Sequence, residues 1–187
     1  MPRTPALRIR AATRADLAAM RALVDVQLGH GYLDAAVDGL YRDSEGFALV
    51  AEVDGTVAGV CLCSVMKPGS VAGTLRSALP DVLRSRRVGL LDTVAVAPDR
   101  TGRGLGTALV TAARERFRSR KVRVWTTAVW RPTTGSGLEP VIGRAGMRPF
   151  TEVPDFWRSA SLAEGFSCPA CGAPPCDCRA VLYAGRV

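Results

Sequence analysis

The chain has 187 residues, 48% of them hydrophobic, and a formal net charge of +8 from 25 lysines and arginines against 17 acidic residues. This length and apolar content predict a full hydrophobic core and exclude a chain that is disordered throughout. No run of about 18 apolar residues occurs, and the start of the chain lacks the apolar segment of a signal peptide, so we expect a cytoplasmic protein with no membrane partner. Most arginines are spread along the chain; dense groups occur only at 84–87 and 114–121, and the second group is expected on the solvent face of a helix.

Apolar residues alternate in some segments, which predicts strands, and recur every three or four residues in others, which predicts helices. In chain order the predicted elements are a strand at 7–11, a helix at 14–28, a weaker helix at 32–42, strands at 47–53, 56–65 and 88–97, a helix at 103–118, a strand at 122–129, a short helix at 138–144, and strands at 148–153 and 180–184. The less regular segment 67–87 is expected to be a mobile connection or a lid that holds one short helix. An α/β fold with a mixed sheet follows from this order.

Three alternating glycines, Gly102, Gly104 and Gly106, lie between the strand at 88–97 and the helix at 103–118. The start of a helix presents unpaired N–H groups and the positive end of the helix dipole. Positions without side chains let a diphosphate approach the backbone, and Arg100 and Arg103 add positive charge beside it. We therefore predict that Thr101–Thr107 holds the phosphates of a nucleotide-type cofactor.

Other interpretations of this glycine segment can be compared with the residues around it. A glycine-rich turn that binds nothing is one of them. A dinucleotide-binding loop is expected to have an acidic residue at the end of the next strand, and none ends the segment 122–130. A Walker loop requires a Lys-Ser/Thr pair after the glycines, and that pair is missing.

Over about residues 7–153, with the strand at 180–184 added, the sequence resembles the GNAT acyl-CoA N-acyltransferases. The most specific part is Val94-Ala95-Val96-Ala97-Pro98 followed by Gly102-Arg103-Gly104-Leu105-Gly106. The family motif is Gln/Arg-x-x-Gly-x-Gly/Ala, and here Thr101 occupies the Gln/Arg position while Arg100 lies one residue early. The segment 9–17 also looks like the first strand and helix of the family.

The resemblance implies a single GNAT-like domain over 1–187, with a mixed and mostly antiparallel central sheet flanked by helices. It implies acetyl-CoA as cosubstrate, with the backbone of Val94 and Val96 available to the pantetheine arm where two strands separate. The residues expected to bind CoA are Val94, Ala95, Val96, Arg100, Thr101, Gly102, Arg103, Gly104, Leu105, Gly106 and Thr107.

Asp92 is the candidate general base. Strand alternation predicts that it shares an apolar face with Leu90, Val94 and Val96, and a carboxylate there is costly unless it has a partner or a purpose. Such burial tends to raise the pKa of a carboxyl group, which suits a base. The resemblance places Asp92 where many family members carry a Glu or Asp base, and the alternative is a structural Asp that caps a neighbouring loop.

No general acid is evident in the sequence. The position that carries a Tyr in many family members corresponds to Ile142, and Tyr183 in the last strand is the substitute considered. His30 is interpreted as a helix-end or surface residue, and Cys61 and Cys63 as packing residues of a strand. The aromatic residues expected to flank an acceptor groove, or to belong to the core, are Tyr32, Tyr41, Trp130 and Phe156.

Four cysteines, Cys168, Cys171, Cys176 and Cys178, have the spacing C-x2-C-x4-C-x-C. Four thiolates in one short loop match the tetrahedral ligand set of a structural Zn²⁺, and Cys-Pro-x-Cys-Gly resembles a zinc knuckle. A redox-active pair, an iron–sulfur cluster and free thiols are the alternatives. The zinc loop, at 166–179, is an addition to the family pattern, inserted before the last strand, where it is expected to be next to the acceptor site.

The sequence thus predicts an N-acyltransferase in which an amine attacks acyl-CoA directly, with Asp92 or a water that it holds as base. The alternative is a non-catalytic acyl-CoA-binding or zinc-containing interaction module. Nucleic acid is a disfavoured partner because few aromatic residues are interleaved with the basic ones. A homodimer is one possible assembly. The acceptor could be a small amine, an antibiotic, a protein N-terminus or a lysine.

Overall fold

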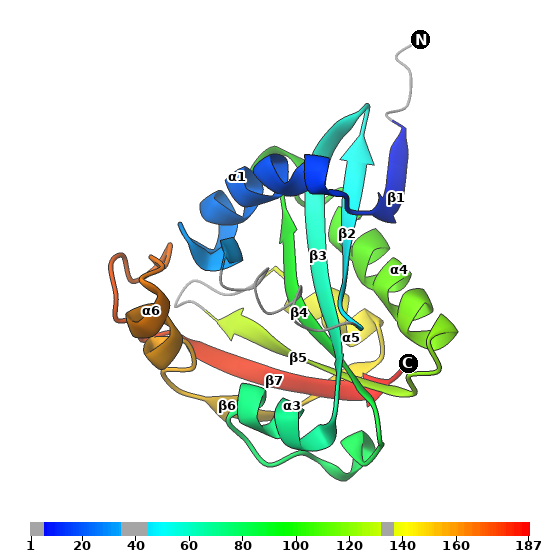
Figure 1. Ribbon diagram of the computed structural model, residues 1–187, viewed down its shortest axis with the longest axis vertical. Helices are drawn as coiled ribbons and strands as arrows, with labels where there is room; N and C mark the ends of the chain where they lie inside the picture. The colour runs from blue at the N-terminus through cyan, green and yellow to red at the C-terminus, as the bar shows by residue number, and fades with distance from the viewer. Residues whose placement is uncertain (1–5, 35–44, 132–136) are drawn as a thin grey trace.

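The computed structural model describes residues 6–34, 45–131 and 137–187 (Figure 1). Its strands are β1 (Leu7–Ala11), β2 (Phe47–Val53), β3 (Thr56–Met66), β4 (Val88–Val96), β5 (Val124–Arg131), β6 (Met147–Val153) and β7 (Arg179–Arg186). Its α-helices are α1 (Leu17–Leu28), α3 (Pro68–Leu75), α4 (Leu105–Ser119), α5 (Glu139–Arg144) and α6 (Arg158–Glu164).

The strands form one sheet in the order β1-β2-β3-β4-β5-β7-β6. Every neighbouring pair is antiparallel except β4 and β5, which are parallel. This parallel ladder has only two residue pairs, Gly89 with Trp125 and Leu90 with Thr126. Beyond them β4 and β5 diverge, as Figure 1 shows, and this part of β4 has no partner strand on its β5 side within the described chain.

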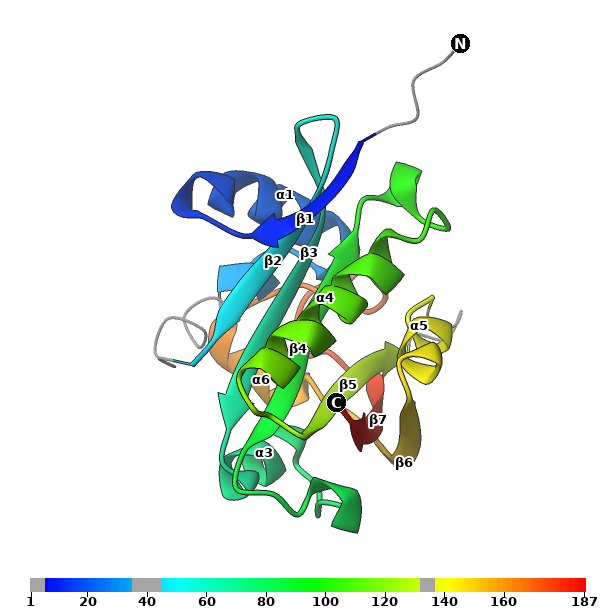
Figure 2. The same ribbon diagram turned by 90° about the vertical axis from the view of Figure 1, so that its right-hand side faces the viewer.

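Side chains that alternate along the strands form cores on both faces of the sheet. Leu49 and Cys61 belong to the core that packs against α4, and Ile142 of α5 lies in the same core. Val50 and Leu62, one residue on, pack against α1 on the other face. Figure 2 shows α1 and α4 on opposite sides of β2 and β3. The mixed, mostly antiparallel sheet flanked by helices is thus confirmed.

The first helix begins where the sequence predicts it. The Thr13 backbone N–H donates to Asp16 Oδ2 at 2.7 Å, which completes the capping box. Arg10 also donates to both carboxylate oxygens of Asp16, at 2.8 Å each, and holds the pKa of that carboxyl far below its ordinary value. A short 3-10 turn, Arg14–Asp16, precedes α1.

The other predicted elements agree with the structure within a few residues, with three exceptions. The predicted helix at 32–42 falls mostly on residues 35–44, which lie outside the described residues, as do 132–136. The segment 67–87 contains the one short helix predicted for it, α3, but it is packed rather than loose, since α3 and the turn Asp81–Leu83 bury Val71, Leu75 and Leu83 against the sheet. Helix α6 was not predicted. Among the described residues, no helix combines the length and apolar character needed to cross a bilayer.

Candidate functional site

A pocket lies where β4 and β5 diverge. Asp92, Thr93 and Val94 line it from β4, and Ala128 and Trp130 line it from β5. The remaining walls come from the end of α1, the start of α5, the residues around α6 and the cysteine loop: Leu28, Tyr32, Leu138, Trp157, Phe166, Cys168 and Cys176. About 510 Å3 of space free of protein atoms lies in and in front of the pocket, and this includes open solvent. Its position gives access to the unpaired edge of β4.

A β-bulge in β4 sets the position of Asp92. Leu62 of β3 pairs with Thr93 while Cys63 pairs with Leu91, so Asp92 is the extra residue between them. The bulge reverses the alternation of side chains along the strand. Leu90 therefore packs in the core beneath α3, whereas Val94 packs against the core beneath α4. The expectation that Leu90 and Val94 share one face with Asp92 is wrong for this reason.

The Asp92 carboxylate is half-buried in the pocket. Burial raises its pKa, and a hydrogen bond from Thr93 Oγ1 to Asp92 Oδ2, at 2.8 Å, opposes part of that rise. The Tyr32 phenol has a raised pKa because it is buried and because Asp92 is near, while side-chain hydrogen bonds with Thr93 and Trp157 act in the opposite direction. The pocket, which is mostly apolar, thus contains one cluster of polar side chains: Asp92, Thr93 and Tyr32.

The glycine segment connects β4 to α4 through the 3-10 turn Pro98–Arg100. Gly104 is the N-cap of α4 with φ +83°, Gly102 has φ +73°, and both conformations strongly favour glycine. A Cβ at either position would meet nothing within 4 Å, so open space lies above the backbone there. No side chain caps the start of α4. Arg100 pairs with Asp99 at 3.1 Å, and Arg103 is exposed.

The backbone of β4 alternates between a paired and an open side. The Ala97 N–H donates to the carbonyl of Ala58 in β3, so the peptide groups of Val94 and Val96 face the divergence from β5. Gln27 Nε2 of α1 already donates to the Val96 carbonyl. A carbonyl has two lone pairs, so this oxygen can still accept a second hydrogen bond.

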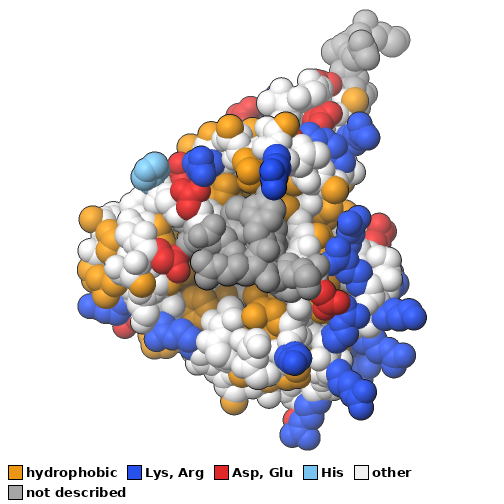
Figure 3. Space-filling view, viewed as in Figure 1, with side chains coloured by type: hydrophobic (Ala, Val, Ile, Leu, Met, Phe, Trp, Pro, Cys, Tyr) orange, Lys and Arg blue, Asp and Glu red, His pale blue; other side chains and the backbone are white. Residues whose placement is uncertain are grey.

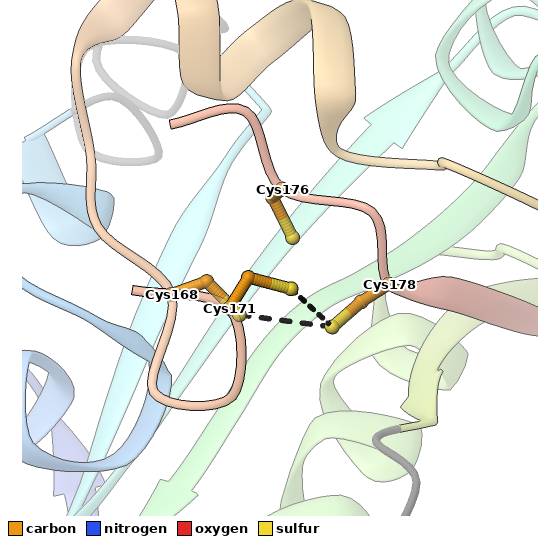
Figure 4. A group of neighbouring side chains, drawn as sticks. All are labelled: Cys168, Cys171, Cys176 and Cys178. Carbon is orange, nitrogen blue, oxygen red and sulfur yellow. Dashed lines mark hydrogen bonds between the residues drawn. The ribbon is translucent and has the colours of Figure 1, made fainter. Parts of the chain in front are cut away.

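The four clustered cysteines converge, as Figure 4 shows. Their sulfur atoms all lie within 4.8 Å of one another. Cys178 Sγ is 3.7 Å from Cys168 Sγ and 3.4 Å from Cys171 Sγ, far beyond disulfide length. A tetrahedral zinc with bonds of about 2.3 Å places its sulfurs about 3.8 Å apart. The donor set and its spacing therefore fit a tetrahedral thiolate-bound metal.

The surroundings of the cysteines resemble the closed environment of a structural metal site. Cys168 and Gly172 exchange two backbone hydrogen bonds of 2.8 Å, and Gly172 adopts φ +83°, which forms the tight turn of the knuckle. Ser161 of α6 accepts a hydrogen bond from the Cys176 N–H at 2.9 Å. Cys168, Cys176 and Cys178 are buried, and only Cys171 is exposed.

The cysteine loop is attached to the end of α1. The Ser167 N–H donates to the carbonyl of His30 at 3.0 Å, and the His30 N–H donates to Ser167 Oγ at 3.1 Å. A Cβ on Gly29 would lie 1.7 Å from the Ser167 carbonyl oxygen, so only glycine allows this approach. The rings of Tyr32 and Phe166 meet edge to face with centroids 5.3 Å apart. The loop therefore forms a wall of the pocket.

Several residues singled out in the sequence lie away from this pocket. Ile142 is fully buried in the α4-side core, and Tyr183 belongs to the same core and does not line the pocket. The thiols of Cys61 and Cys63 are buried 3.6 Å apart. The His30 side chain is 86% exposed and lies 3.1 Å from Asp25.

Of the aromatic residues predicted near the acceptor groove, Tyr32 and Trp130 line the pocket, and Tyr41 falls outside the described residues. Phe156 does not line it; instead its neighbour Trp157 does, with the two rings 4.7 Å apart. Thr93, Leu28 and Phe166 were also missed. Thr93 could have been noticed as a hydroxyl beside Asp92, whereas no local sequence signal brings Phe166 to Tyr32.

Lysine and arginine side chains gather along the side of the molecule that α4 forms, at the right of Figure 3. Arg116 and Arg118 are exposed there, as expected for the solvent face of this helix. The guanidinium groups of Arg116 and Arg120 lie over the Phe47 ring, at 5.8 and 4.8 Å from its centroid. These two guanidinium groups therefore already stack on an aromatic ring of the protein.

The divergence of β4 and β5 within the sheet, together with helix α4 beginning at a glycine-rich turn, defines a protein of the acetyltransferase fold. Residues 17–134 match the model described as Acetyltransferase (GNAT) family. The chain belongs to this family. It also carries a cysteine cluster at 168–178, before its last strand β7. No curated protein matches the sequence.

Solved structures with the same fold cover nearly the whole chain. Arabidopsis thaliana NAA60 in complex with acetyl-CoA has a TM-score of 0.71 and 11% identity, over 97% of this chain and 99% of that one. Ard1 from Thermoplasma volcanium has a TM-score of 0.67 and 17% identity, over 97% of each chain. Ribosomal-protein-alanine N-acetyltransferase from Brucella melitensis has a TM-score of 0.62 and 19% identity, over 96% of this chain and 99% of that one.

Proposed function

We propose that this protein is an acetyl-CoA-dependent N-acetyltransferase. The observation that carries the proposal is a half-buried carboxylate, Asp92, in a pocket at the divergence of β4 and β5, on the strand that leads to the glycine-rich start of α4. A phosphate-binding segment and a candidate base are thereby fixed on one continuous stretch of chain. We treat residues 1–187 as one domain with 166–179 as an insertion.

In the proposed reaction the amine nitrogen attacks the thioester carbonyl carbon of acetyl-CoA. Asp92, or a water that it holds, accepts the proton that the amine loses. The C–S bond then breaks, the acetyl group stays on nitrogen, and CoA leaves as a thiolate. A thiolate is stable enough to leave without an obligatory proton donor, so the absence of a phenol at Ile142 does not prevent the reaction.

The proposed CoA site combines the exposed glycine turn with the open edge of β4. The N–H groups at the start of α4 and the helix dipole would bind the pyrophosphate. The peptide groups of Val94 and Val96 would pair with the pantetheine arm. The residues proposed to contact CoA are Val94, Ala95, Val96, Arg100, Thr101, Gly102, Arg103, Gly104, Leu105, Gly106 and Thr107.

We also propose that Cys168, Cys171, Cys176 and Cys178 hold one zinc ion. Four protein thiolates leave no open position on a tetrahedral metal, so the ion would supply structure rather than chemistry. Its effect on the site would be to fix the loop that carries Phe166 against Tyr32 and α1.

Two measurements on the purified protein test the proposed function. Acetyl-CoA is expected to raise the melting temperature while NAD leaves it unchanged, because only acetyl-CoA carries a pantetheine arm that can pair with the open edge of β4. An amine panel with a free-thiol assay should then show amine-dependent release of CoA. Stabilisation without thiol release would instead support the non-catalytic acyl-CoA-binding alternative, and no stabilisation would contradict both.

Replacing Gly104 with alanine is expected to raise the KM for acetyl-CoA at least tenfold. The added methyl group would project into the open space above the turn and strain a residue at φ +83° by about 1–2 kcal/mol. Gly165→Ala is the matched control, because Gly165 also flanks a helix with positive φ and open space around it, but it follows the C-terminal end of α6, whereas Gly104 precedes the start of α4. Equal changes in KM for both variants would contradict a role for the turn in binding.

Replacing Thr93 with valine is expected to move the acidic limb of the kcat/KM profile to higher pH by about one unit. The Thr93 hydroxyl stabilises the ionised Asp92, so its loss raises the pKa of that carboxyl further. A base acts only when deprotonated, so activity should fall below the new pKa and stay unchanged well above it. Thr93→Ser keeps the hydroxyl and should keep the wild-type profile.

A further inference from the structure

We propose that the acceptor is a small primary amine with one positive charge, a flat apolar body and no carboxylate, of the arylalkylamine type. This inference rests on the proposed function and concerns the acceptor side of the same pocket. It follows from the described side chains that surround Asp92 and from the kinds of group that are missing among those described residues.

Aromatic and aliphatic side chains form most of the pocket surface. Tyr32, Trp130, Trp157 and Phe166 contribute rings, and Leu28 and Leu138 add aliphatic groups. Rings of this kind stack on a flat ligand and attract an ammonium group through their faces. They offer little to a hydrophilic chain, which would lose its hydration on entry.

Among the described residues that line the pocket, one carries a carboxylate; Cys168 and Cys176 also line it, and as proposed zinc ligands they add no positive charge to this wall. Asp92 is the only acidic residue among the described residues that line it, and no lysine, arginine or histidine is among them. The Asp92 carboxylate can attract one ammonium group; that group loses a first proton to solvent to become the attacking amine, and Asp92 accepts the second proton as the amine attacks. A substrate carboxylate would be buried without a cationic partner beside Asp92, so α-amino acids should be rejected.

Few neutral polar groups line the pocket within the described chain, and the Thr93 hydroxyl already donates to Asp92. A peptide would bring backbone N–H and C=O groups that need new partners when buried. A polyamine would bring a second ammonium group, for which the described lining offers no second carboxylate. Both classes should therefore be poorer acceptors than a monoamine with a ring.

A comparison of four acceptors at saturating acetyl-CoA tests the proposal on the whole wild-type chain. 2-Phenylethylamine is expected to have a kcat/KM at least tenfold above those of phenylalanine, spermidine and a short peptide with an N-terminal alanine. Phenylalanine is the sharpest comparison, because it carries the same ring and amino group and adds only the carboxylate.

Two variants that each introduce an arginine on α1 test whether this pocket is the acceptor site. Leu28→Arg places a cation in the lining, and is expected to raise the KM for 2-phenylethylamine at least tenfold and to reduce its advantage over phenylalanine by a similar factor. Val26→Arg makes the same change two residues earlier, at a side chain that is 64% exposed, and should alter neither value. The KM for acetyl-CoA should stay within twofold in both variants, which also reports correct folding.

The outcomes separate this inference from the function on which it rests. If the enzyme acetylates phenylalanine, spermidine or the peptide as well as 2-phenylethylamine, or better, the inference on the acceptor is overturned and the acetyltransferase function stands. If acetyl-CoA binds and no amine in the panel accepts an acetyl group, the proposed function fails as well. Unchanged acceptor selectivity in a folded Leu28→Arg would also count against the pocket as acceptor site.

Discussion

Asp92→Asn is expected to lower kcat by about 10²–10⁴-fold, the range typical of losing a positioned general base. Asparagine preserves the size of the side chain and can still accept a hydrogen bond from Thr93, but it cannot take a proton from the amine. Steady-state release of CoA thiol measures the effect. Asp81→Asn is the control, because this carboxylate is 86% exposed on the turn before β4 and lies outside the pocket.

The pH profile distinguishes loss of a base from a local distortion. Burial raises the pKa of Asp92, so kcat/KM of the wild type should rise with pH until this carboxyl is ionised. In Asp92→Asn that limb should disappear, and the residual rate should follow only the ionisation of the amine. A variant that acetylates at the wild-type rate across pH would remove Asp92 from the mechanism.

Removal of the proposed zinc is expected to lower the stability of the protein by at least about 4 kcal/mol, which corresponds to roughly 8–16 °C in Tm for a chain of this size. Without the metal, nothing cross-links the four cysteines, and the loop that contacts Gly29, His30 and Tyr32 is no longer held in place. Acetylation should fall with it, since the same loop walls the pocket. Chelation followed by thermal melting, with metal analysis of the starting protein, is the measurement.

Two cysteine variants provide the matched comparison for this loss. Cys178→Ser should abolish stoichiometric zinc, whereas Cys63→Ala, at a buried thiol in the α4-side core, should cost stability but keep one zinc per chain. Protein that carries no metal as isolated and melts at the same temperature with or without chelator would rule out the structural zinc.

The elements on which the site depends could be read from the sequence because their signals are local. The glycine turn follows a strand rich in β-branched residues and precedes an amphipathic helix. The four clustered cysteines lie within one stretch of eleven residues, 168–178. The position of Asp92 was harder to predict. Its bulge results from pairing with β3, about 30 residues earlier in the chain, and strict alternation cannot show where one residue is left over.

The pocket wall was less predictable than the cofactor turn for the same reason. Helix α6 is a seven-residue helix whose apolar residues show no clear period, and it is held by contacts such as that of Ser161 with the Cys176 N–H. The ring of Trp157 enters the pocket only because of this packing. Tyr183 appeared to be a substitute acid from its place in the last strand, yet the pleat of β7 directs it into the core.

The hydrogen bond between His30 and Ser167 joins residues 137 positions apart. During synthesis the ribosome releases the chain from its N-terminus, so the turn at 101–107 and most of β4 are free to fold while the cysteine loop is still unmade. The end of α1 gains this partner only after Ser167 has been made and has emerged. On the proposed function, a nascent chain would thus form the turn that binds CoA well before it completes the wall of the acceptor pocket.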